Sequence, residues 1–185
     1  IDRTLGQIPA VLSDPHTGMK QAVEQLKEKG HTHIGYLSGP QETSTGRQRL
    51  HAFKAATRGM PTHIHHGSYR HREGYKGALA LLQEGVTALI AGDSMMTAGA
   101  LEACHNAGKR IGEEIALVGF DDFIYLRFQP SPISVVDQDV ARMGETATAK
   151  LIAAINDKHQ PEGEVLETRY IPRMSTAHQL DGATP

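Results

Sequence analysis

The sequence is poor in cysteine, in net charge and in long apolar runs, and each shortage excludes a class of protein. Its 185 residues contain one cysteine, Cys104, which excludes an internal disulfide framework and a cysteine-rich zinc site. The net charge is −2, so the chain has no bulk attraction for nucleic acid or for an anionic membrane surface. No apolar run approaches the roughly 20 residues that a membrane-spanning helix needs. The composition is instead typical of a globular domain.

The first residues, IDRTLGQIPAVL, also lack two features of a chain start. They contain no basic region leading into an apolar one, so they do not resemble a signal peptide. They lack an initial methionine, and we therefore expect the sequence to begin inside a longer protein. With the single cysteine, these features favour a cytoplasmic location.

Apolar runs alternate with segments of helical periodicity along most of the chain. We expect strands at 7–12, 33–39, 62–66, 87–91, 114–122, 134–136 and 165–171. We expect helices at 15–29, 47–57, 73–83, 95–107 and 140–155. Strands separated by helices of this length imply βαβ units, and hence mostly parallel sheets flanked by helices. The predicted fold class is therefore α/β.

Polar side chains follow five successive predicted strands, where ligands bind in sheets of this kind. Carboxylates and arginines can each bind adjacent hydroxyl groups bidentately, and an aromatic ring can stack on a sugar. The residues are Thr43, Ser44, Thr45, Arg47, Arg49, Tyr69, Arg70, Asp93, Ser94, Asp121, Asp122, Asp137, Gln138 and Asp139. About half of them would be expected from ordinary loop composition. Their recurrence after five strands favours a site for a polyhydroxylated ligand.

The stretch Gly92-Asp93-Ser94 raises a catalytic alternative, with Ser94 as a hydrolase nucleophile at a helix N-terminus. Esterases with such a block commonly place an Asp-x-x-His late in the chain. No aspartate stands three residues before any of the eleven histidines here, and a serine without a base is not activated. We therefore predict that the chain is not an enzyme. Ser94 is interpreted as the N-cap of the following helix.

A metal site is the other alternative. Four histidines lie close in the sequence, namely His63, His65, His66 and His71. The first two share one face of the predicted strand, but the third points the opposite way, and no further ligand follows at a fixed spacing. We predict neither a metal nor a cofactor. Asp121 and Asp122 alternate in the same manner, so only one of them can face the site.

Six short motifs occur in a characteristic order. They are Gly30-His31-x-His33-Ile34-Gly35-Tyr36-Leu37-Ser38-Gly39-Pro40, Arg49-Leu50-x-Ala52-Phe53, Gly74-Tyr75, Asp93-Ser94-Met95-Met96-Thr97-Ala98-Gly99-Ala100-Leu101, Val118-Gly119-Phe120-Asp121-Asp122 and Arg173-x-Ser175-Thr176-Ala177. Together they resemble the lactose-repressor (LacI/GalR) family of transcriptional regulators. The chain resembles the C-terminal two-thirds or so of their effector-binding domain.

This resemblance implies a periplasmic-binding-protein-like architecture of two parallel α/β subdomains joined by three crossovers. Residues 1–12 and 137–158 would be remnants of an N-terminal subdomain, which is incomplete here. Residues 13–136 and 159–180 would form the C-terminal effector-binding subdomain, and 181–185 a tail. Operator DNA would be bound through a helix-turn-helix that is not present in this chain.

The resemblance also implies a set of ligand contacts. They are Thr45, Arg49, Tyr69, Asp93, Asp121 and Gln138, with Asp2 as a contact from the other lobe. Arg49 would be the bidentate anchor and Tyr69 the stacking aromatic. Asp93 stands where relatives usually have asparagine, so it accepts hydrogen bonds only and favours ligand hydroxyls.

The function implied is the binding of a small-molecule effector, a sugar or a derivative, by a transcriptional regulator. The helix at 95–107 and the segment near 124–128 would form a homodimer interface, and no membrane partner is expected. A periplasmic sugar-binding protein of a transport system shares this fold and site, and is the alternative. The VGFDD and RxSTA stretches resemble the regulators instead.

Overall fold

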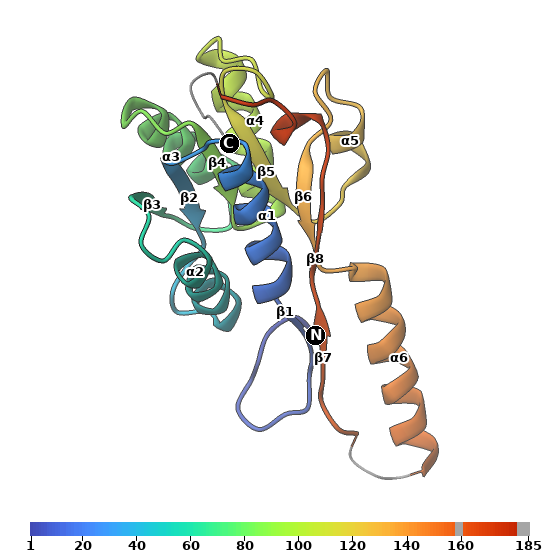
Figure 1. Ribbon diagram of the computed structural model, residues 1–185. Helices are drawn as coiled ribbons and strands as arrows, with labels where there is room; N and C mark the ends of the chain where they lie inside the picture. Colours follow the sequence, from blue (N-terminus) through green and yellow to red (C-terminus); the bar gives the residue numbers. More distant parts are fainter. Residues whose placement is uncertain (158–160, 181–185) are drawn as a thin grey trace.

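The computed structural model describes residues 1–157 and 161–180 and contains two separate sheets (Figure 1). The strands are β1 (Val11–Asp14), β2 (Ile34–Ser38), β3 (Thr62–His66), β4 (Ala88–Ala91), β5 (Ala116–Phe120), β6 (Ser134–Asp137), β7 (Glu164–Glu167) and β8 (Arg169–Ile171). The helices are α1 (His16–Glu28), α2 (Ser44–Ala56), α3 (His71–Gln83), α4 (Ser94–Asn106), α5 (Ile124–Arg127), α6 (Val140–Asp157) and the 3₁₀ turn η1 (Met174–Thr176). The α/β class is confirmed.

The larger sheet has the strand order β3-β2-β4-β5-β6-β8 and is parallel except for the last pair. Alternate side chains of each strand point to opposite faces. In β2, Tyr36 packs with α1 and α2 on one face, and Leu37 packs with α3 and α4 on the other. Because both faces are covered, the inner strands read as unbroken apolar runs.

Helices α3 and α4 pack with their backbones in contact. A Cβ atom added at Gly74 would lie 2.5 Å from the Cα of Met96, and one at Gly99 would lie 2.2 Å from the carbonyl oxygen of His71. No side chain fits in that space, so the two glycines permit the close approach. This packing fixes the position of the α4 N-terminus.

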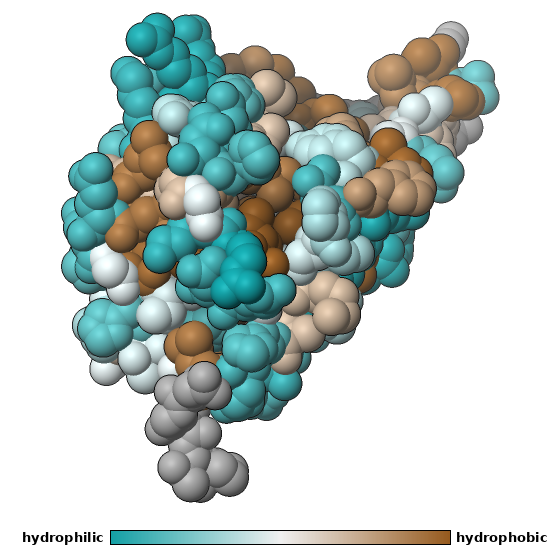
Figure 2. Space-filling view, turned by 90° about the horizontal axis from the view of Figure 1, so that it is seen from above, coloured by the Kyte–Doolittle hydropathy of each residue, from teal (hydrophilic) through white to brown (hydrophobic). Residues whose placement is uncertain are grey.

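The smaller unit consists of β1 and β7, paired in parallel, with α6 against them. Among the residues that the structure describes, its apolar core consists of three buried side chains, those of Val11, Met143 and Leu166. Several apolar side chains of this unit remain exposed, namely Val140, Leu151, Ile152, Ile155 and Val165. The part of the molecule that projects at the upper right of Figure 2 is correspondingly coloured mainly brown. Residues 13–14 and 164–167, expected in the larger subdomain, lie in this smaller sheet.

Three chain segments run side by side between the two units: after β1, after β6 and at Thr168 (Figure 1). Thr168 Oγ1 donates to the carbonyl oxygen of Asp14 at 2.8 Å and accepts from the Gly18 amide at 3.2 Å. A Cβ at Gly18 would lie 2.8 Å from that hydroxyl. The single strand predicted at 165–171 is therefore broken at Thr168, because β7 joins one sheet and β8 the other.

Two local features also differ from expectation. Helix α2 begins at Ser44 rather than at Arg47, because Thr43 Oγ1 accepts from the Gly46 amide at 3.1 Å and caps the helix there. The short elements α5 and η1 lie in segments without clear periodicity and were not predicted. Among the helices that the structure describes, none is long and apolar enough to cross a membrane.

Candidate functional site

The candidate site lies at the carboxyl ends of the parallel strands β2, β4, β5 and β6. The loops after β4, β5 and β6 carry Asp93, Asp121 and Gln138, and the loop after β3 carries Tyr69. Helix α2, which follows β2, presents Thr45 and Arg49 on its first turns. Arg49 and Gln138 are 4% and 5% exposed, and Asp121 is 8% exposed. Charged and polar side chains are rarely buried this far unless they are paired. We therefore expect these buried polar side chains to be paired with one another.

Arg49 is the centre of the cluster. Its Nη1 donates to the carbonyl oxygen of Gly92 at 2.9 Å, and its Nη2 donates to Gln138 Oε1 at 3.3 Å. The guanidinium carbon lies 3.9 Å from the centroid of the Phe120 ring, a cation–π distance. These contacts hold the guanidinium plane in one orientation, as bidentate recognition requires.

Asp121 follows β5 directly and faces the same cluster. Its Oδ1 accepts from Gln138 Nε2 at 2.8 Å. Burial raises the pKa of Asp121 to about 6, although Arg49 and the Gln138 amide oppose the rise; Asp93 and Asp2 add to it. Its φ of +64° lies in the left-handed region, which non-glycine residues seldom adopt. The carboxylate is thus both desolvated and held by a strained backbone.

Tyr69 and Thr45 form the neighbouring part of the site. The Tyr69 hydroxyl donates to Thr45 Oγ1 at 3.2 Å, and the Arg49 guanidinium carbon lies 5.9 Å from the Tyr69 ring centroid. Gly39 makes room for this ring, because a Cβ there would lie 2.1 Å from Tyr69 Cε1. The ring and the guanidinium are therefore positioned beside each other.

Asp93 has a structural role that the sequence interpretation assigned to its neighbour. Its Oδ1 accepts from the amides of Met95 at 2.8 Å and Met96 at 3.3 Å, so Asp93 is the N-cap of α4. The N-cap prediction for Ser94 is wrong: Ser94 is the first residue of the helix. The cap uses one carboxylate oxygen of Asp93 and leaves the second without a contact in the helix.

Asp2 reaches the cluster from the other end of the chain. Its Oδ1 lies 3.5 Å from Arg49 Nη2 and is buried without a hydrogen-bond partner among the described residues. Its φ is +65°. The structure thus brings Asp2, Arg49, Asp121 and Gln138 into direct contact. Thr45 and Tyr69 adjoin them, and Asp93 influences Asp121 electrostatically.

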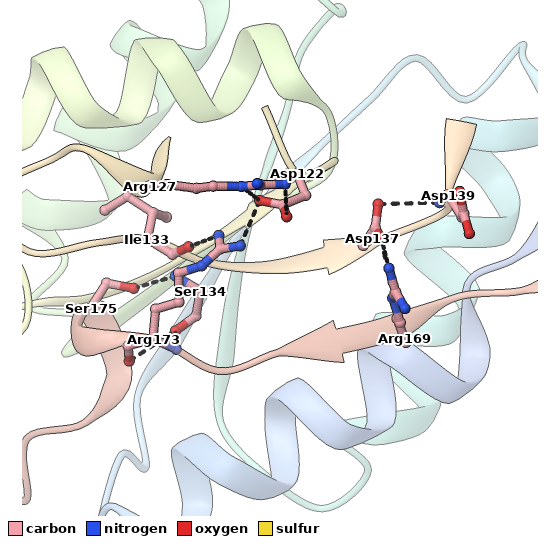
Figure 3. Close-up of polar contacts among 9 residues, drawn as sticks. All are labelled: Asp122, Arg127, Ile133, Ser134, Asp137, Asp139, Arg169, Arg173 and Ser175. Carbon is pink, nitrogen blue, oxygen red and sulfur yellow. Dashed lines mark hydrogen bonds and ion pairs between the residues drawn. The ribbon is translucent and has the colours of Figure 1, made fainter. Parts of the chain in front are cut away.

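Asp122 belongs to a separate network of arginine contacts (Figure 3), as expected if only one of the two neighbouring aspartates faces the site. It pairs with Arg127 Nη2 at 2.7 Å and with Arg173 Nη2 at 2.7 Å. Arg173 also donates to the carbonyl oxygen of Ile133 at 2.7 Å. This network fastens the segment after β8 to the loop after β5, and it takes no part in the candidate site.

The clustered histidines also lie apart from the site. His63 pairs with Glu84 and His71 with Glu102. Among residues 1–157 and 161–180, no group of three or more histidine, cysteine, aspartate or glutamate side chains is arranged to hold a metal ion.

Sequence reasoning missed three contributors. Ser13 Oγ donates to Gln138 Oε1 at 2.7 Å, and the signal was available, since Ser13 follows a predicted strand. Phe120 belongs to a buried strand, so its contact with Arg49 could not be told from core packing. The Tyr36 hydroxyl is buried without a hydrogen-bond partner in the described chain, and it lies 2.8 Å from where a Cβ of Gly92 would be.

Comparison with known proteins gives a consistent result. A family model described as a periplasmic binding protein-like domain matches residues 23–176. The HTH-type transcriptional repressor PurR of Escherichia coli O1:K1 is 31% identical over 176 residues, covering 91% of this chain and 52% of PurR. The crystal structure of a probable LacI family transcriptional regulator from Corynebacterium glutamicum is 40% identical, with a TM-score of 0.86, over 94% of this chain and 66% of that one.

A third relative is the transcriptional regulator CelR, solved as a complex with cellobiose. It is 30% identical, with a TM-score of 0.83, over 94% of this chain and 57% of CelR. The chain spans about half the length of the curated relatives it matches. These relatives are regulators rather than transport proteins or enzymes. The chain therefore belongs to the periplasmic binding protein-like domain family, as an effector-binding domain of the LacI/GalR type.

Proposed function

We propose that this chain binds a sugar or sugar derivative and thereby controls a LacI-type transcriptional regulator of which it is part. The observation that carries the proposal is the buried cluster of Arg49, Asp121 and Gln138 at the strand ends. Arg49 would donate to adjacent ligand hydroxyls, and Asp121 would accept from one. Tyr69 would stack on the ring, and Thr45 and Asp93 would bind hydroxyls at its edge. The relative solved with cellobiose supports a sugar as the ligand class.

The smaller unit supports the domain assignment. We propose that β1, β7 and α6 belong to an N-terminal subdomain that other residues of the parent protein complete. The exposed apolar side chains of α6, such as Leu151 and Ile155, support this, because a two-stranded sheet with one helix buries little. Such a subdomain would supply the second wall of the ligand site.

The parent protein would act as a cytoplasmic homodimer. A dimer surface is supported by the exposed side chains of Phe123, Ile124, Tyr125 and Phe128, beside a hollow of about 660 Å³ between α4 and residues 125–133. Operator DNA would be bound by a helix-turn-helix outside this chain. No catalytic step is proposed.

The ligand is found and the site tested in the full-length protein. A thermal-shift panel of monosaccharides, cellobiose and sugar phosphates identifies a binder, and calorimetry then gives its affinity. Arg49→Ala should cost about 2 kcal/mol or more, or about thirtyfold in affinity, because a charge-assisted hydrogen-bond pair is lost.

Arg58→Ala is the matched control, since Arg58 is exposed just beyond the other end of α2. Its affinity should equal that of the wild type. Equal affinities for the wild type and Arg49→Ala would contradict the site assignment.

A further inference from the structure

We propose that Gln138 is a positioning residue that couples ligand occupancy to the connections between the two units. This inference rests on the proposed function, since it describes how the same site would be regulated. It assigns to Gln138 a role distinct from that of a ligand contact.

The amide of Gln138 already holds the two charged groups that would anchor a ligand. Its Nε2 donates to Asp121 Oδ1 at 2.8 Å, and its Oε1 accepts from Arg49 Nη2 at 3.3 Å. A ligand that takes the Nη2 donor of Arg49 and the Oδ1 acceptor of Asp121 therefore competes with Gln138 for both. Because Gln138 is 5% exposed, solvent does not readily replace the bonds that it loses.

The same oxygen of Gln138 also reaches the smaller unit. It accepts from Ser13 Oγ at 2.7 Å, and Ser13 lies in β1, where it is paired with Leu166 of β7. The two atoms belong to residues 125 positions apart in the chain. A single side chain thus joins the ligand-binding groups to the smaller sheet.

Gln138 itself stands in one of the three connections. Its neighbour Asp139 has a φ of +52°, and its other neighbour, Asp137, pairs with Arg169 Nη2 at 3.0 Å, just past the third connection (Figure 3). A movement of the Gln138 backbone is therefore transmitted to the neighbouring connections. Gln138 therefore lies at a position where an exchange of its hydrogen bonds can change how the two units are arranged.

The exchange has two end states. Without ligand, Gln138 binds Asp121, Arg49 and Ser13 together. With ligand on Asp121 and Arg49, Gln138 is released, and Ser13 loses its acceptor unless the smaller unit shifts. An unpaired buried hydroxyl is unfavourable, so ligand binding favours the shifted arrangement.

The test measures the affinity of the full-length protein for the best-binding sugar of the panel, with and without operator DNA. In the wild type the two affinities should differ by about tenfold, within the usual range for coupled sites. In Gln138→Ala the affinities with and without operator DNA should differ by less than twofold.

Ser13→Ala is the second variant, and it leaves the ligand-binding groups intact. The ratio of its affinities with and without operator DNA should also fall toward one. Thr148→Ala, which removes an exposed hydroxyl from α6 of the same unit, is the control and should keep the wild-type ratio.

The outcomes separate the two proposals. A wild type that binds no sugar of the panel, or whose affinity is the same with and without DNA, overturns the proposed function and the coupling with it. A different result is that the wild-type affinity differs with and without DNA while the Gln138→Ala and Ser13→Ala variants keep the wild-type ratio of the two affinities. That result overturns the role proposed for Gln138 and leaves the proposed function standing. A tenfold loss of affinity in Gln138→Ala at an unchanged ratio makes Gln138 a ligand contact only, and likewise overturns it.

Discussion

At the scale of single residues, Asp121 combines two unfavourable features, a desolvated carboxylate and a left-handed backbone. Residues held in this way concentrate at functional sites, where the surrounding fold compensates for their cost. Here Arg49 and Gln138 provide that compensation. The same balance makes the stability of the protein depend on pH in a direction that can be measured.

We predict that Asp121→Asn becomes more stabilising as the pH rises from 4 to 7. Because the pKa of Asp121 is raised to about 6 in the folded state, the stability that it contributes is present below pH 4 and is lost as the pH rises through 6. Asparagine tolerates the positive φ and can accept the same hydrogen bond. The gain in the free energy of unfolding at pH 7 should be on the order of 3 kcal/mol at most.

Asp122→Asn is the control of opposite sign in the same denaturation series. Burial raises the pKa of Asp122, but Arg127 and Arg173 outweigh this and lower it. The stability from Asp122 is therefore present at neutral pH and is lost as the pH falls below about 4. Parallel pH profiles for the two variants would contradict both assignments.

The candidate site could be predicted from the polar residues that follow each strand. This signal identifies side chains in the segments beyond the sheet, but not those within a strand. Asp121 and Gln138 directly follow β5 and β6, Arg49 lies on the helix that follows β2, and the three meet as expected from the parallel order of the strands. Phe120 and Ser13 differ, because their role depends on which distant residue packs against them. The N-cap assignment at the start of α4 fails for a local reason: aspartate and serine both cap helices well, and one residue of register decides between them.

At the scale of elements, the contact between α3 and α4 depends on residues without side chains. Sequence periodicity predicts both helices, but it does not show that their backbones touch. Gly99 sits against the carbonyl oxygen of His71 and the amide nitrogen of Tyr75, at 2.2 and 2.5 Å from an added Cβ. Those atoms belong to the backbone of a packed helix and cannot move aside.

We predict that Gly99→Ala lowers the free energy of unfolding by at least about 2 kcal/mol, because overpacking outweighs the roughly 1 kcal/mol gained in helix propensity. Gly144→Ala on α6 is the matched control, since nothing lies within 4 Å of its added Cβ. It should gain about 0.5–1 kcal/mol. Urea denaturation checks both, and a gain in stability for Gly99→Ala would contradict the contact.

The segment predicted as the last strand is divided between the two sheets, which local sequence patterns cannot predict. Residues 165–171 alternate as one strand does, yet β7 and β8 lie in different sheets. The break at Thr168 is set by its bonds to Asp14 and Gly18, which lie 154 and 150 residues earlier in the chain. Local periodicity carries no information about such partners, and the sequence alone could place the crossover only through the family resemblance.

At the scale of the whole molecule, the proposed dimer has a clear anchor. Phe128 is 79% exposed and Ile124 is 63% exposed, and each is next in the chain to a residue that lines the hollow beside α4, Gln129 and Tyr125. Burying one such ring contributes about 1.5–3 kcal/mol, and a symmetric interface buries it twice.

We predict that Phe128→Glu raises the dimer dissociation constant of the full-length protein at least about thirtyfold, because each protomer loses an apolar contact and gains a charge to desolvate. Phe128→Leu keeps the apolar contact and should remain dimeric. Analytical ultracentrifugation distinguishes the two variants. An unchanged sedimentation profile for the glutamate variant would contradict the proposal that Phe128 lies in the dimer interface.

The three connections between the units have a consequence for how the protein is made. Asp14 and its partner Thr168 lie 154 residues apart, so β1 leaves the ribosome long before β7 exists. At about 5–20 residues per second, that interval is roughly 8–30 s. Strands β2 to β6 of the larger sheet can be synthesised and folded in that time, whereas β1 waits for its partner strand. The smaller sheet and the β6 edge of the larger sheet, which β8 covers, are thus the last to form, and newly made chains pass through a stage in which both are open to chaperones.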